Sequence, residues 1–284
     1  MSEYSKEVLN LEDQIELLKS RKLIFDDLDK AKKYLTHIWY YRLSQYFKAN
    51  QFFRKKKNII IYRDLFKDNT HFKDVIDLYK FDRELRLLTM DMIERIEISI
   101  RSILINELSL NKKNPFCYLD LENFSNQESA EKVRNHIYRS ITNNKYKKHD
   151  VWNHFNKKYQ KSFFPPIWMI LNTSDFGLVT NIYKNLKFDL RNKIAKIYDL
   201  DENIFWQQIE VIRQIRNIVS HHERLFNTSY SYWETSSIKF HKFIKKLDYL
   251  KSKIVPTSSW NSKVLELYKK YDYLAPVEKY KYES

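Results

Sequence analysis

The chain has 284 residues, a formal charge of +15 at pH 7 and 43% hydrophobic residues, which is enough apolar material for a folded core. It contains one glycine, Gly177, and five prolines. Phosphate-binding loops need several glycines so that the backbone can approach a phosphate, so this composition excludes them. The single cysteine, Cys117, excludes an intramolecular disulfide framework and a cysteine-based zinc cluster. An almost wholly helical protein fits these numbers best.

The charge and the N-terminal sequence predict a partner and a compartment. A strongly basic chain favours a polyanionic partner, with nucleic acid ahead of an anionic membrane surface. The first residues lack the apolar segment of a signal peptide, and no run of about 18 apolar residues could span a membrane. We therefore expect a cytoplasmic protein that needs no membrane, metal or other cofactor.

Residues 1–70 are predicted as an N-terminal helical region. Two helices are expected between residues 8 and 50, the second around residues 31–49. The basic run Arg54–Lys57 then precedes a β-branched stretch. This pattern is typical of a short β-hairpin or of an extended loop.

Residues 71–235 are predicted as the helical core, and its clearest element is a helix over residues 72–108. Apolar residues at positions 78, 81, 85, 88, 92, 96, 100 and 103 form one continuous stripe. Asp82 with Arg86, and Glu97 with Arg101, have the i,i+4 spacing of helical ion pairs. Exposed surface pairs are the favoured interpretation of these four residues, and buried support for a site is the alternative.

A basic insertion occupies residues 132–163, with nine lysines or arginines against one acid. Aromatic residues alternate with these cations, which suits a flexible strand whose phosphates need charge and whose bases need stacking surfaces. A solvated loop between helices is the competing interpretation. The residues that we expect to contact RNA here are Lys145, Lys147, Lys148, Lys157, Lys158 and Lys161.

After the insertion, Pro165 and Pro166 predict an extended entry to a helix, with Ser174 or Asp175 as a later helix cap. Gly177 indicates a turn or a close contact between helices. Residues 236–284 are predicted as a basic C-terminal helical extension. Its Lys245 and Lys246 are further candidates for RNA contact.

The helix predicted over residues 203–222, with Asn203 as its N-cap, carries an unusual arginine. Its apolar face comprises Phe205, Ile209, Ile212, Ile215 and Val219. Arg216 projects within that face. A charge among apolar neighbours is costly unless it is paired, so Arg216 must meet a carboxylate, carbonyl oxygens, a partner subunit or a phosphate.

Two histidines follow, His221 and His222. On a straight helix His221 points roughly 140° away from Arg216. The two side chains can therefore meet at one atom only if the helix bends near Ser220 or if a second copy supplies the opposing side. Arginine matches phosphate and imidazole exchanges protons near neutral pH, so together they could cleave RNA through its own 2′-hydroxyl without a metal.

Four blocks of the sequence resemble the Abi family of bacterial abortive-infection proteins, which includes AbiD and AbiF. They are YYRLSQY at 40–46, LYKFDRELRLLTMDMIERIEISIRS at 78–102, PPIWMILNTSDFGLVTNIY at 165–183 and IRNIVSHHERLFN at 215–227. The last block also resembles the Arg-Asn-x3-His signature of the HEPN superfamily of helical ribonucleases. The resemblance implies an all-α, HEPN-like helical bundle. The rest of the sequence adds N- and C-terminal helices to it and allows one short β-hairpin.

The resemblance also implies a function and a site. It implies metal-independent endoribonuclease activity at a homodimer interface, leaving a 2′,3′-cyclic phosphate and a 5′-hydroxyl. Arg216 and His221 match the arginine and histidine of the signature, and Asn217 matches its polar second position. His222 and Arg224 belong to the trailing part of the Abi block, where we assign His222 to the catalytic group and Arg224 to RNA contact.

Three functions remain open on the sequence. The first is a phage-defence ribonuclease or toxin. The second is a catalytically silent HEPN protein that binds a structured noncoding RNA, and this RNA would act as an antitoxin or as a guide. The third is a helical protein-interaction module whose charge reflects compositional bias.

Overall fold

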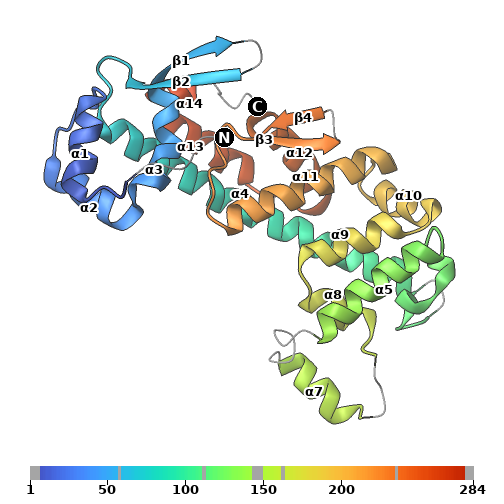
Figure 1. The fold of residues 1–284 in the computed structure, drawn as a ribbon. Helices are drawn as coiled ribbons and strands as arrows, with labels where there is room; N and C mark the ends of the chain where they lie inside the picture. Colours follow the sequence, from blue (N-terminus) through green and yellow to red (C-terminus); the bar gives the residue numbers. More distant parts are fainter. Residues whose placement is uncertain are drawn as a thin grey trace. The chain divides into compact units, whose positions relative to one another are not determined.

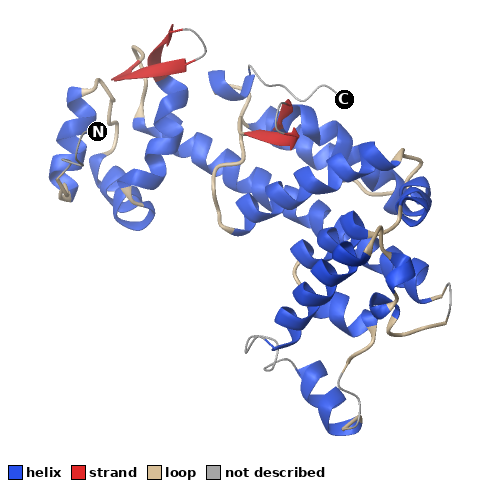
Figure 2. Ribbon diagram, turned by 45° about the vertical axis from the view of Figure 1, so that its right-hand side comes forward, coloured by secondary structure: helices blue, strands red, loops and turns tan. Residues whose placement is uncertain are grey.

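The computed structural model describes residues 7–56, 59–110, 113–142, 150–160, 164–233 and 236–278. It has an all-α fold with two small antiparallel hairpins in the described residues, as Figures 1 and 2 show. The α-helices are α1 (Leu11–Ser20), α2 (Leu28–Ile38), α3 (Tyr40–Phe47), α4 (Phe72–Ser109), α5 (Gln127–Thr142), α7 (Asp150–Lys158), α8 (Ile167–Thr173), α9 (Phe176–Asn185), α10 (Phe188–Ile197), α11 (Glu202–Ser220), α12 (Phe240–Ile254), α13 (Trp260–Lys270) and α14 (Ala275–Glu278). The strands are β1 (Gln51–Lys56) with β2 (Ile59–Phe66), and β3 (Ser229–Trp233) with β4 (Ser236–Lys239).

The predicted all-α fold with a short hairpin is confirmed, and the long helix and the first hairpin lie where the sequence placed them. The helix predicted around residues 31–49 is wrong, because the chain breaks at Trp39 into α2 and α3. The second hairpin was not predicted. Gly177 lies in the first turn of α9, where an added Cβ would come within 3.1 Å of the Asp175 carboxylate that caps the helix. Its small size leaves room for that cap.

The chain divides into two compact units, which we describe separately. The first unit comprises Met1–Leu88, Arg224–Phe226 and Trp260–Ser284. Its core centres on Phe81 of α4, whose ring packs edge-on against Phe226 and Tyr268 at centroid distances of 5.2 Å each. Trp260 at the start of α13 donates its indole N–H to the carbonyl of Leu88 at 2.7 Å.

The second unit comprises Thr89–Glu223 and Asn227–Ser259. Phe205 of α11 lies at its centre, stacked on Tyr198 at 4.8 Å and edge-on to Tyr183 at 5.4 Å. The Tyr198 hydroxyl is 2.8 Å from Ser99 Oγ, which joins the end of α10 to α4. Strand β3 packs on α11, and strand β4 leads directly into α12.

None of the described helices combines the length and the apolar character that crossing a membrane requires.

Candidate active site

Helix α11 presents the candidate catalytic residues near its C-terminal end. It begins at Glu202 with Asp201 at the N-cap, so the predicted cap at Asn203 lies two residues too late. The predicted apolar face is buried, which fixes the rotation of the helix in the second unit. Its buried residues include Phe205, Ile209, Ile212, Ile215 and Val219.

Arg216 pairs with a carboxylate, which is one of the partners that its apolar surroundings require. Its Nε lies 3.4 Å from Oε1 of Glu97 on α4, and its side chain is 31% exposed. The other Glu97 oxygen is 3.3 Å from Nη2 of Arg101, which also donates to the carbonyl of Ser174 at 3.3 Å. Glu97 therefore holds two arginines side by side.

The Glu97 side chain is only 8% exposed, so the expectation of a surface ion pair is wrong for Glu97 and Arg101. Burial raises the pKa of the Glu97 carboxyl above its usual range, and the positive charges of Arg101 and Arg216 oppose that rise. With the carboxylate ionised, the three side chains carry one net positive charge. A partly exposed cluster of this kind suits an anion such as a phosphate.

The end of α11 is a Schellman motif built on a residue other than glycine. The amide of His222 donates to Val219 O at 3.1 Å, and the amide of Glu223 donates to Ile218 O at 2.9 Å. His222 adopts φ 59°, the left-handed conformation that glycine usually supplies at this position. The helix thus ends at Ser220, and the chain leaves it sharply.

Asn217, His221 and His222 are all exposed. His221 is the C-cap, and its amide still donates to Asn217 O at 3.0 Å, so its Cα keeps a nearly helical position. The angular offset of roughly 140° between Arg216 and His221 follows from that position. The arrangement within one copy therefore favours the alternative in which a second copy completes a site.

Residues Arg224–Phe226, which follow the two histidines, form hydrogen bonds within the first unit. The Arg224 guanidinium donates through Nη1 to the carbonyl of Gln45 in α3 at 2.6 Å. This contact gives Arg224 a structural role in the fold, and the RNA contact that the sequence indicated stays a prediction. The amides of Leu225 and Phe226 donate to Asp82 Oδ1 at 3.1 and 2.6 Å.

Asp82 lies at the centre of a buried polar cluster in the first unit, and it is fully buried. Besides the two amides, it accepts hydrogen bonds from the Tyr46 hydroxyl at 2.6 Å and from the Arg86 guanidinium. Burial raises the pKa of Asp82, while Arg86, Tyr46 and the two amides favour the charged carboxylate. The interpretation of Asp82 and Arg86 as a surface pair is therefore wrong.

The lysines predicted to contact RNA fall into three groups. Lys157 and Lys158, at the end of α7, are exposed, and so is Lys245 of α12. Lys246, also on α12, is half-buried. The others, Lys145, Lys147, Lys148 and Lys161, lie outside the described residues.

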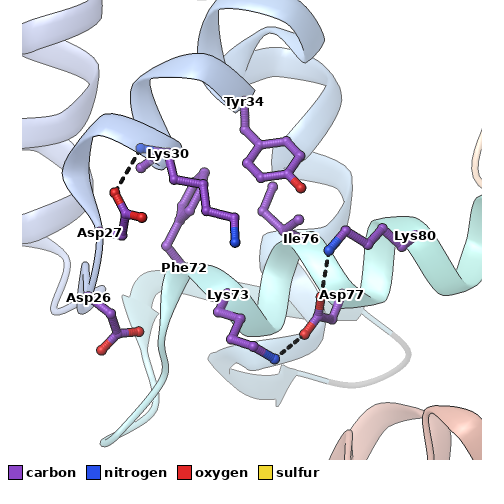
Figure 3. A pocket seen from close by; sticks show the side chains of 10 residues that line it. Asp26, Asp27, Lys30, Tyr34, Phe72, Lys73, Ile76, Asp77 and Lys80 are labelled. Carbon is purple, nitrogen blue, oxygen red and sulfur yellow. Dashed lines mark hydrogen bonds and ion pairs between the residues drawn. The ribbon is translucent and has the colours of Figure 1, made fainter.

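Sequence reasoning gave no sign of the pocket in the first unit that Figure 3 shows. It has a volume of about 170 Å³ and lies between the start of α2 and the start of α4. Phe72 and Ile76 contribute apolar surface, and Asp77 accepts from both Lys73 and Lys80. Because these charged groups already satisfy one another, the pocket offers no evident chemistry.

Among the described residues, no three histidine, cysteine or acidic side chains are grouped closely enough to hold a metal ion. Cys117 is buried, and burial raises the pKa of its thiol to about 12, which makes it unreactive at neutral pH.

Comparison with known proteins gives one match. No curated protein and no solved structure matches the chain. A family model described as Abi-like protein matches residues 33–227, more than two thirds of the sequence. The matched range contains the whole of α11 and two groups of contacts. We call Asp82 with Tyr46, Arg86 and the two amides the Asp82 cluster, and Glu97 with Arg101 and Arg216 the Glu97 cluster. On this match, the chain belongs to the Abi-like protein family and is linked through it to abortive infection, a defence against phage.

Proposed function

We propose that this protein is a metal-independent endoribonuclease of phage defence, a member of the HEPN superfamily, whose site uses Arg216 and His221. The observation that carries the proposal is the Glu97 cluster beside the exposed end of α11. A buried carboxylate fixes two arginines, and Arg216 remains 31% exposed on the helix that ends in exposed Asn217 and His221.

The chemistry follows from these groups. The 2′-oxygen of RNA attacks the adjacent phosphorus, and the bond from phosphorus to the 5′-oxygen breaks, leaving a 2′,3′-cyclic phosphate and a 5′-hydroxyl. Histidine transfers a proton, either from the attacking 2′-hydroxyl or to the departing 5′-oxygen. Arginine stabilises the charge that develops on the phosphorane oxygens.

A homodimer is part of this proposal. Since Arg216 and His221 point in different directions on one copy of α11, a cleft between two copies would bring the arginine of one toward the histidine of the other. Lys157, Lys158 and Lys245 are exposed cations that would add attraction for the RNA backbone.

The test is RNA cleavage by purified protein in excess EDTA. We expect His221→Ala and Arg216→Ala to abolish cleavage, with products of the wild type carrying 2′,3′-cyclic phosphate ends. Arg213→Ala is the matched control, because Arg213 lies one turn earlier on α11 and pairs with a different carboxylate, Glu210, with Nη2 and Oε1 2.5 Å apart. Cleavage that survives His221→Ala, or that requires a metal, would refute the proposal.

One observation favours a second candidate, a catalytically silent protein that binds a structured RNA. This RNA would serve as its inhibitor or guide. The Nε of Arg216 is engaged by Glu97, and a single copy does not aim Arg216 and His221 at one atom. In that case the wild type and His221→Ala would retain RNA equally well and neither would cut it.

A further inference from the structure

Trp39 occupies a strained backbone conformation without burying its ring. Between α2 and α3 it adopts φ 70° and ψ 141°, close to a region that is almost confined to glycine and costs other residues about 1–3 kcal/mol. Its amide donates to Leu35 O at 3.0 Å, and its carbonyl accepts from the Leu43 amide at 3.3 Å. Any residue could make these main-chain bonds. The fold therefore uses the backbone of Trp39 but leaves its indole 55% exposed.

The indole lines a cavity of about 810 Å³ in the first unit, which we call the N-terminal pocket. This volume is within the range of ligand-binding sites in proteins. Tyr41, which is 75% exposed, contributes a second aromatic surface, and the exposed Lys48 contributes a cation.

One wall of the N-terminal pocket is held in place by internal contacts. The Tyr40 hydroxyl accepts from Arg21 Nη1 at 3.0 Å, and Arg21 Nη2 lies 3.6 Å from Asp64 of β2. The Tyr40 ring also packs edge-on against Phe47 at 5.5 Å. These contacts preform the wall, so a ligand need not order it on binding.

A buried polar group of the same pocket lacks a partner. Gln14 is 4% exposed, and its Nε2 donates to Leu9 O at 2.9 Å. Its Oε1 has no hydrogen-bond partner in the described part of the chain. A buried acceptor left unpaired costs free energy, which a ligand N–H would recover.

We propose that the N-terminal pocket binds an unpaired base of single-stranded RNA. The base stacks on Trp39 and Tyr41, one of its N–H groups donates to Gln14 Oε1, and Lys48 attracts the adjoining phosphate. Aromatic surfaces beside cations are the usual means of holding unpaired bases with little regard to sequence. The net charge of +15 favours a polyanion over a free nucleotide.

This inference rests on the RNA partner of the proposed function but not on cleavage, and its test separates the two. The probes are fluorescein-labelled hexamers of 2′-O-methyl uridine and 2′-O-methyl adenosine, which lack the 2′-hydroxyl nucleophile. Fluorescence anisotropy in EDTA gives their dissociation constants. Trp39→Gly removes the ring and suits the backbone, and we expect it to weaken binding about tenfold or more.

Trp168→Ala is the matched control, because Trp168 is a 43% exposed tryptophan on α8 in the second unit, and its loss should change affinity less than about twofold. Trp39→Tyr keeps an aromatic ring and should retain most of the affinity. Thermal denaturation of each variant confirms folding. Binding by folded Trp39→Gly that equals wild type would overturn the proposal.

Competition identifies the source of the base. If uridine or adenosine monophosphate displaces the hexamers at concentrations near the hexamer dissociation constant, the ligand is a free nucleotide and the assignment to RNA is wrong. If Trp39→Gly weakens binding of the hexamers, while His221→Ala abolishes cleavage of unmodified RNA and leaves hexamer binding unchanged, base binding and cleavage depend on different residues. Absence of cleavage in the wild type would refute the nuclease and leave the binding result for Trp39→Gly decisive for the pocket.

Discussion

The Asp82 cluster gives a sharp prediction about stability. In Asp82→Asn the amide oxygen can still accept from the amides of Leu225 and Phe226, but the negative charge beside Arg86 is lost. The Arg86 side chain is 6% exposed, so its guanidinium would stay buried after losing its ion pair with Asp82. Breaking a buried pair in this way costs about 3–5 kcal/mol. We expect a loss of that size in the free energy of unfolding of the first unit.

The same helix supplies a matched control for this prediction. Asp91 and Arg95 have the same i,i+4 spacing on α4, with Nη2 and Oδ1 3.2 Å apart, but their side chains are 48% and 44% exposed. Water screens such a pair, so Asp91→Asn should cost less than about 0.5 kcal/mol. Urea denaturation followed by circular dichroism measures both variants.

A double variant identifies the cause. Asp82→Asn with Arg86→Met also removes the buried charge that Asp82 no longer balances and keeps an acceptor for the two amides, so it should recover a large part of the stability lost in Asp82→Asn. The reasoning is refuted if Asp82→Asn costs no more than Asp91→Asn. It is refuted equally if the double variant is as unstable as the single one.

Substitutions of Glu97, His222 and His241 test other parts of the structure. Glu97→Gln should slow RNA cleavage about tenfold to a hundredfold in single-turnover assays, because Arg216 loses the charge that orients it, and an unchanged rate would remove Glu97 from the site. His222→Gly should be at least as stable as wild type and His222→Val less stable by about 1–2 kcal/mol in thermal denaturation, since φ is positive there, and the reverse order would contradict the left-handed turn. Burial and the neighbouring Lys239 and Lys242 lower the pKa of His241 in the folded protein. Below about pH 6.5 the unfolded chain therefore binds a proton that the folded protein resists, and the free energy of unfolding falls. His241→Gln should make the melting temperature drop less between about pH 7.5 and 5.5, and a drop as large as that of the wild type would contradict this.

The sequence predicted α4 well because its stripe of apolar residues is long and regular. It did not predict which ion pairs on α4 are buried. Asp82 with Arg86 and Asp91 with Arg95 have the same spacing, and only the first is covered. That cover comes from segments far away in the chain, and local periodicity carries no information about them.

The break at Trp39 was missed, and the end of α11 was predicted at residue 222, two residues beyond Ser220, for a related reason. Glycine and proline are the usual signals of a helix end, and neither occurs at these positions. Both residues adopt positive φ values, which are uncommon for residues other than glycine. The candidate site was partly predictable: the apolar setting of Arg216 required a counter-charge, but the sequence did not decide that Glu97 would provide it.

Contacts of α4 connect the four sequence blocks that resemble the Abi family. In the first unit Asp82 accepts from Tyr46 of one block and from the Leu225 and Phe226 amides of another. In the second unit Glu97 pairs with Arg216, and Arg101 binds the carbonyl of Ser174.

The blocks therefore encode in large part the contacts that hold α3, α11 and the turn between α8 and α9 to α4. A match to such contacts is strong evidence for the fold, and it constrains catalysis less directly. Asn217 and His221 differ from these residues because both are exposed, and no buried side-chain contact within the described residues accounts for them. Substitutions at Asn217 and His221 should therefore change cleavage activity while leaving the free energy of unfolding nearly unaltered. Substitutions at Asp82 should lower the free energy of unfolding before they change cleavage activity. Measuring stability and cleavage on the same variants separates residues that build the Abi-like fold from those of the proposed cleavage site.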